Sequence, residues 1–89
     1  MERRVYVFEG NVQGVGFRYT AANLALQYDV KGYVRNLPDG RVELVAEGPP
    51  RDLDSLLEDI AHKMQGLIRN THMRREPPTG EFDRFCIRH

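Results

Sequence analysis

The sequence contains little that would indicate a disulfide, a membrane segment or a reactive thiol. Cys86 is the only cysteine in 89 residues, which excludes an internal disulfide and fits a reducing cytosol. No apolar run approaches the roughly 20 residues that a membrane-spanning helix needs. The apolar run that follows Arg4 is also too short for a signal peptide. We therefore expect a cytoplasmic protein with no membrane partner.

Charge and histidine content exclude further classes. Lys plus Arg and Asp plus Glu are equal at 13 each, so no overall positive charge attracts a nucleic acid. His62, His72 and His89 are scattered without metal-ligand spacing, so we expect neither a metal site nor a cofactor. The apolar (40%) and charged (29%) contents are those of a globular protein, and residues 1–89 should form one domain. Because no spare apolar face is evident, we expect a monomer.

The hydrophobic pattern predicts alternating strands and helices in the first half of the chain. β-branched and aromatic side chains make residues 3–9 a strand. Apolar residues then recur at helical spacing, which predicts a helix over residues 18–28. Asp29 is expected to end this helix with a left-handed backbone, in the position where glycine is commonest. Strands over 30–36 and 41–47 follow, joined by a tight turn.

The second half begins with the clearest amphipathic pattern, a helix that starts at Pro49-Pro50 and ends at Gly66. Its apolar face is expected in the core and comprises Leu53, Leu56, Leu57, Ile60, Ala61 and Met64. Residues 67–76 form a plausible polar edge strand, and residues 82–88 a last strand in which Cys86 should be inert. The order is βαββαβ with one possible extra strand. It predicts an α+β, ferredoxin-like sandwich, a mostly antiparallel sheet with two helices on one face.

The stretch from Gly10 to Arg18 is the first candidate site. It carries three glycines and closes with an arginine at the expected start of a helix. Exposed N–H groups at a helix N-terminus favour a phosphate, and a guanidinium adds a planar fork of donors for its oxygens. The alternative is a glycine-rich turn with Arg18 in solvent, and the spacing alone leaves both interpretations open.

Asn36 is the second candidate, at the end of a predicted strand. If the first two strands are neighbours, its amide would lie near the loop of residues 10–18 and could hydrogen-bond a water molecule. Asparagine is also favoured at the start of a turn, and this interpretation stays open beside the first.

Two motifs together resemble the acylphosphatase family, whose members hydrolyse carboxyl–phosphate anhydrides. Val12-Gln13-Gly14-Val15-Gly16-Phe17-Arg18 is similar to the active-site loop of the family. Gly32-Tyr33-Val34-Arg35-Asn36, followed by Gly40, Val42 and Gly48, is similar to its second signature. The resemblance implies a ferredoxin-like sandwich, with the essential arginine of the family at Arg18 and its essential asparagine at Asn36. It also implies a phosphate cradle formed by the backbone of Gln13, Gly14, Val15, Gly16 and Phe17.

The activity that the resemblance implies is metal-independent hydrolysis of an acyl phosphate to a carboxylate and inorganic phosphate. We expect Arg18 and the cradle to hold the phosphoryl group and Asn36 to orient the attacking water. Phe8, Asp29 and Leu37 depart from common family members, which have an aliphatic residue, glycine and threonine there. No side chain outside the cradle marks an acyl pocket, so broad tolerance of the acyl part is expected.

Two other functions use the same fold. Lys31-Gly32-Tyr33-Val34 faintly resembles an RNA-recognition strand, although the balanced charge and the lack of paired exposed aromatics argue against a non-enzymatic RNA-binding module. The second alternative is a domain that handles carbamoyl phosphate, as in the N-terminal portion of hydrogenase-maturation carbamoyltransferases. Those proteins are much longer chains.

Overall fold

The computed structural model describes all 89 residues, which form five strands and two helices. Both C-terminal segments with strand character are strands, so the order is βαββαββ. The elements are β1 (Glu2–Gly10), α1 (Phe17–Ala25), β2 (Lys31–Asn36), β3 (Val42–Gly48), α2 (Pro50–Lys63), β4 (Ile68–Glu76) and β5 (Phe85–Arg88).

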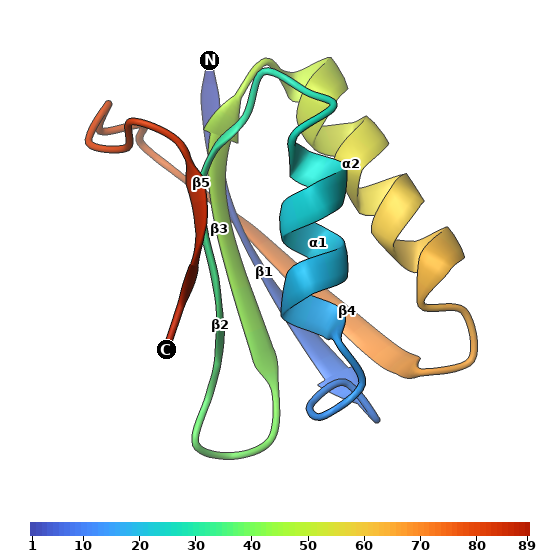
Figure 1. The fold of residues 1–89 in the computed structure, drawn as a ribbon. Helices are drawn as coiled ribbons and strands as arrows, with labels where there is room; N and C mark the ends of the chain where they lie inside the picture. The colour runs from blue at the N-terminus through green and yellow to red at the C-terminus, as the bar shows by residue number, and fades with distance from the viewer.

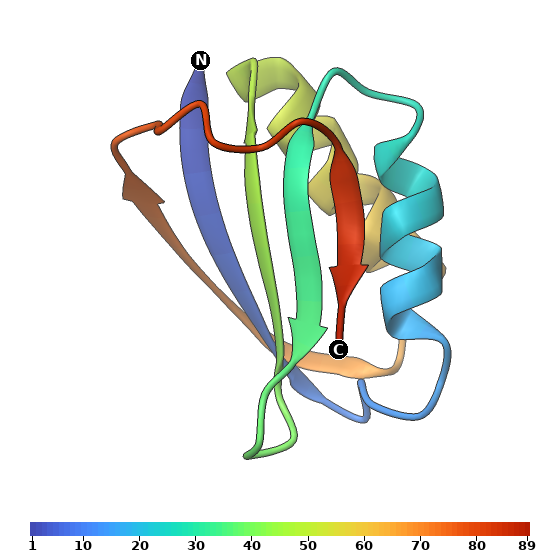
Figure 2. The ribbon, with the colours of Figure 1, turned by 60° about the vertical axis from the view of Figure 1, so that its left-hand side comes forward.

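The five strands form one sheet in the order β4-β1-β3-β2-β5. Neighbouring strands are antiparallel except β2 and β5, which run parallel. Both helices cover the same face of this sheet (Figure 1). The segment between β4 and β5 crosses the opposite face near one end (Figure 2). The arrangement is the α+β ferredoxin-like sandwich that the sequence predicts.

The core fills the space between the helices and the sheet. Strand residues of alternating position and one stripe from each helix supply it, as the two-residue and helical periods require. Its largest fully buried side chains are Tyr6, Phe8, Leu44, Leu53, Leu56, Ile60, Val12, Val34 and Val42. Ala61, predicted in the core, is exposed. It lies at the margin of the α2 stripe, about 100° around the helix from Ile60.

Helix α1 is shorter than the predicted span, and its end is built differently. After Ala25, the N–H groups of residues 26–28 donate to carbonyls three residues back, so the helix closes in 3₁₀ turns. The prediction of a left-handed Asp29 is wrong, since no residue other than glycine has a positive φ. The tight turns already redirect the chain, and the N–H of Asp29 donates to Asp52 Oδ2 of α2 at 3.0 Å.

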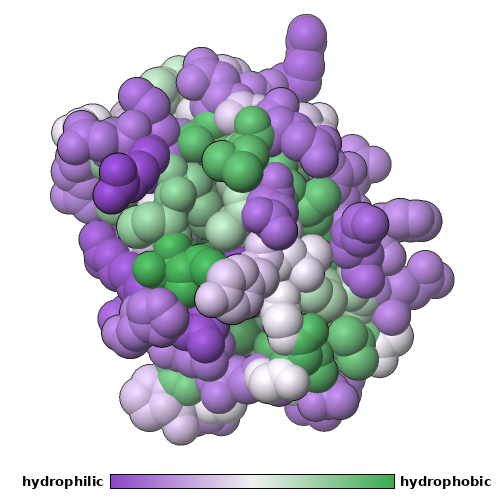
Figure 3. All heavy atoms as spheres, viewed as in Figure 1, coloured by the Kyte–Doolittle hydropathy of each residue, from purple (hydrophilic) through white to green (hydrophobic).

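The outer surface mixes polar and apolar groups. On the face in Figure 3, several separate hydrophobic areas lie among hydrophilic ones. Large exposed hydrophobic side chains include Val15 of the β1–α1 loop, Tyr19 of α1, Leu26 just after α1, and Met73 of β4. No helix is long and apolar enough to cross a membrane. Cys86 is exposed on β5, between the half-buried Phe85 and Ile87.

Candidate active site

A cavity of about 160 Å³ brings both predicted functional side chains together. It lies at the end of the sheet where the β1–α1 loop and the β2–β3 hairpin are found (Figure 1). Its lining comprises Val12, Gly14, Gly16, Phe17, Arg18, Tyr19 and Asn36. Three of the five predicted cradle residues therefore line it, together with Arg18 and Asn36. Gln13 and Val15 do not, and the Val15 side chain is exposed.

The loop wall of the cavity depends on two glycines in left-handed backbone. Gly14 and Gly16 both have φ of 76°, and Gly16 is the N-cap of α1. Glycine adopts this backbone without the steric cost that a Cβ brings. The Gly16 carbonyl accepts the N–H of Thr20 at 3.0 Å, which starts the helix. The buried Phe17 packs its ring against Phe8, with centroids 5.0 Å apart, and anchors this first turn in the core.

The backbone amides of this loop are unusual in having no internal partner. None of the N–H groups of residues 13–18 donates to a backbone carbonyl. Some of this follows from geometry, because the first N–H groups of any helix lack an intrahelical acceptor. Together with the N-terminal end of the α1 dipole, these groups make an environment suited to an anion.

Arg18 adds a cation to the same cavity. It takes part in none of the ion pairs of the structure. Its one side-chain contact of hydrogen-bond length is between Nη1 and Nδ1 of His89, at 3.4 Å. The guanidinium therefore has donors that no carboxylate occupies. The approach of His89, which follows β5, was not predicted, because nothing in the local sequence relates the two residues.

Asn36 reaches the cavity by a different route from the one that the sequence suggested. Strands β1 and β2 are not neighbours, because β3 lies between them. Asn36 is the last residue of β2 and pairs with Val42, the first residue of β3. The loop after β1 nevertheless reaches the hairpin, because its Gln13 side chain hydrogen-bonds the Leu37 and Arg41 carbonyls beside Asn36. The expected proximity is correct, while its presumed cause is wrong.

Tyr19 lines the cavity and was missed by the sequence reasoning. It follows Arg18 in the first turn of α1, and 68% of its surface is exposed. Val12 also lines the cavity, from the core side, and is buried. Only helical position could have indicated Tyr19, since its side chain belongs to no recognisable motif.

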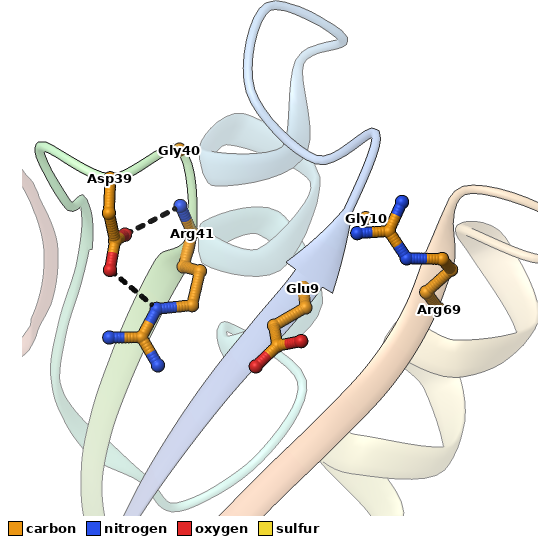
Figure 4. A pocket seen from close by; sticks show the side chains of 6 residues that line it. All are labelled: Glu9, Gly10, Asp39, Gly40, Arg41 and Arg69. Carbon is orange, nitrogen blue, oxygen red and sulfur yellow. Dashed lines mark hydrogen bonds and ion pairs between the residues drawn. The ribbon is translucent and has the colours of Figure 1, made fainter.

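A second cavity of about 320 Å³ lies nearby, between the hairpin, the end of β1 and the start of β4. Glu9, Gly10, Asp39, Gly40, Arg41 and Arg69 line it (Figure 4). Its charges largely pair with one another or with neighbours: Arg41 Nε contacts Asp39 at 2.8 Å, and Glu9 contacts His72 at 2.8 Å. Hydrogen bonding, chiefly from the Arg41 N–H, lowers the pKa of Asp39. This cavity contains neither Arg18 nor Asn36.

No group of three or more His, Cys, Asp or Glu side chains is arranged to hold a metal ion.

The family model for acylphosphatases matches residues 4–87. The chain belongs to the acylphosphatase family. It is similar to an acylphosphatase of Methanospirillum hungatei, with 41% identity over 90 residues that cover 99% of this chain and 98% of the relative. The predicted family and its acyl phosphate hydrolase function are confirmed, and the RNA-binding alternative is not favoured.

Solved structures agree with this assignment. The crystal structure of an acylphosphatase from Bacillus subtilis matches with a TM-score of 0.92 and 32% identity, and covers 100% of both chains. A full-length HypF protein matches with a TM-score of 0.86 and 26% identity, over 99% of this chain but 12% of the HypF chain. The acylphosphatase fold thus also occurs inside a much longer protein.

Proposed function

We propose that this acylphosphatase hydrolyses acyl phosphates by in-line attack of a water molecule, with Arg18 and Asn36 as its two functional side chains. Arg18 and the backbone amides of residues 13–18 hold the phosphoryl oxygens. Asn36 orients the water that attacks phosphorus. The products are a carboxylate and inorganic phosphate, and the reaction as proposed requires no metal ion.

The observation that carries this proposal is the shared cavity of Arg18, Asn36 and the left-handed glycines. Backbone N–H groups without backbone partners can donate to phosphoryl oxygens without first breaking other hydrogen bonds. Because they are already in place, they need not reorganise as charge shifts in the transition state. The Arg18 guanidinium supplies a planar pair of donors to the equatorial oxygens.

The leaving group explains why the proposed reaction needs no general acid. A carboxylic acid has a pKa of about 4, so its oxygen departs as a carboxylate without a general acid. The remaining tasks are to position the phosphoryl group, offset its charge and align the water. The Asn36 side chain can both accept a hydrogen bond from that water and donate one.

The substrate class can be tested by comparing two phosphates that differ in their leaving group. Hydrolysis of benzoyl phosphate should be rapid, while p-nitrophenyl phosphate, a monoester, should be cleaved slowly or not at all. Benzoyl phosphate hydrolysis should be unchanged by EDTA. Cleavage of the monoester alone would contradict the proposal, and so would activity that EDTA removes and Mg²⁺ restores.

A further inference from the structure

The Gln13 side chain makes a contact that the catalytic proposal does not use. Gln13 is half-buried, and its Nε2 donates to two carbonyls, that of Leu37 at 2.8 Å and that of Arg41 at 2.9 Å. Leu37 directly follows Asn36, and Arg41 directly precedes Val42, the strand partner of Asn36. One amide group therefore connects both sides of the hairpin next to the Asn36–Val42 pair, where the β2–β3 ladder ends.

This contact joins two parts of the site that the sheet does not join. Because β3 separates β1 from β2, no strand ladder connects the β1–α1 loop to Asn36. The start of the loop is held on the other side, where the Asn11 N–H donates to the Leu67 carbonyl at 2.8 Å. No other hydrogen bond connects residues 11–16 with the hairpin.

The chemistry of the contact makes it specific for an amide. The Arg41 carbonyl already accepts the Leu37 N–H at 2.8 Å, the bond that closes the hairpin. The two carbonyl oxygens have further lone pairs that can accept hydrogen bonds. The two protons on Gln13 Nε2 are donated to them, one to each carbonyl. A carboxylate in the same place would set negative oxygen against both carbonyl oxygens.

We propose that Gln13 is a positioning residue, whose side chain sets the place of Asn36 relative to the phosphate cradle. Its backbone belongs to the loop that holds the phosphoryl group, and its side chain fixes the strand end that holds the water. The inference rests on the proposed function, since it assumes that Asn36 orients the water. A misplacement of about 1 Å in such a site costs on the order of 100-fold in rate.

The test combines kinetics with a double-mutant cycle. Gln13→Met keeps the length of the side chain and removes the amide. It should lower kcat for benzoyl phosphate by about 10-fold or more, while the inhibition constant of inorganic phosphate changes by less than about 3-fold. In the Asn36→Ala background, Gln13→Met should lower kcat by no more than about 2-fold further, because the residue that it positions is gone. Gln13→Glu should also lower kcat, and its negative charge in the cradle loop should additionally weaken inhibition by phosphate. Gln65→Met, at an exposed turn, should match the unmodified enzyme.

Three results would overturn the inference: an unchanged kcat in Gln13→Met, equal losses in kcat and phosphate affinity in that variant, or an undiminished loss in the Asn36→Ala background. A measurement on the unmodified protein applies even if Gln13→Met does not fold. The Gln13 side-chain amide protons should exchange with solvent more slowly than those of the exposed Gln65, and equal rates would contradict the contact. If the unmodified protein does not hydrolyse benzoyl phosphate, the proposed function is contradicted. The exchange rates of the Gln13 amide protons would still test the hydrogen bonds between Gln13 and the hairpin.

Discussion

At the scale of single residues, truncation of Arg18 and truncation of Asn36 should affect turnover and phosphate binding differently. Arg18→Ala removes the cation of the cavity, so both phosphate inhibition and turnover of benzoyl phosphate should be lost, with kcat/KM down by about 100-fold or more. Asn36→Ala removes only the group that orients the water. Its kcat should fall by about 100-fold while the inhibition constant of phosphate stays within about 3-fold.

Matched controls exist for both changes. Arg51→Ala removes an exposed arginine of α2 that belongs to no ion pair, and Asn70→Ala removes an exposed asparagine of β4. Both variants should keep the original kinetics. A parallel loss of turnover and phosphate affinity in Asn36→Ala would show that Asn36 holds the phosphate rather than the water.

The sequence predicts these two residues because each belongs to a local motif, but it cannot predict their neighbours. His89 meets Arg18 only through the position of α1 relative to the end of β5. Gln13 was expected to act through its backbone, and the reach of its side chain depends on where the hairpin lies. Tertiary contacts of this kind leave no periodic signal.

At the scale of elements, the shape of the β1–α1 loop depends on the left-handed backbone of Gly16. A Cβ at this position would meet no atom within 4 Å, so Gly16→Ala adds backbone strain without a steric clash. We expect the free energy of unfolding in urea to fall by about 1 kcal/mol. Relaxation of the strain would also turn cradle amides away from the cavity, so phosphate should inhibit about 3- to 10-fold more weakly.

Gly66→Ala provides the control for this prediction. Gly66 follows α2 and has φ of 86°, and a Cβ added there would likewise meet no atom within 4 Å. The variant should therefore lose similar stability without any change in phosphate inhibition. Equal effects of both variants on phosphate inhibition would show that the loop responds to global stability and not to its own backbone.

The element boundaries show which signals the sequence carries well. Period-two and helical patterns located β1, β2, β3 and α2 to within a few residues, because each buries one face. The end of α1 was misplaced because the apolar pattern continues through Tyr28, which packs against the core after the helix has ended. An apolar side chain at helical spacing indicates that the residue is buried, but it does not indicate whether its backbone is hydrogen-bonded as part of the helix.

At the scale of the whole molecule, the sequence predicts the fold class but not the strand order. Its pattern indicates a sheet covered by two helices on one face, and the structure confirms this. The placement of β3 between β1 and β2 is a long-range property, set by how the strands pair once the helices dock. β5 was also expected to be longer; the segment before it crosses the open face of the sheet instead (Figure 2).

Glu47 holds that crossing segment to the rest of the molecule. It is 3% exposed on β3 and contacts Arg3 of β1 through an ion pair at 2.9 Å. Its carboxylate also accepts the N–H groups of Thr79 and Gly80, at 2.8 and 2.9 Å. One buried carboxylate thus connects the N-terminal strand, the centre of the sheet and the segment that leads to β5.

These contacts make acid stability depend on Glu47. Burial alone would raise the pKa of its carboxyl group, but the Thr79 N–H, the Arg3 guanidinium and the Gly80 N–H outweigh it and lower the pKa from 4.5 to about 2. Because the folded pKa lies below the unfolded one, the stabilisation is complete above pH 4.5 and is lost as the pH falls toward 2. The free energy of unfolding measured in urea should decrease by up to about 3 kcal/mol across this window.

Glu47→Gln should be less stable at pH 7 and have a flatter pH dependence, while Glu58→Gln, at an exposed site on α2, should behave like the unmodified protein. If Glu47→Gln kept the original slope between pH 4.5 and 2, the acid sensitivity would have to come from other carboxylates, such as Glu76, whose pKa Arg3 also lowers.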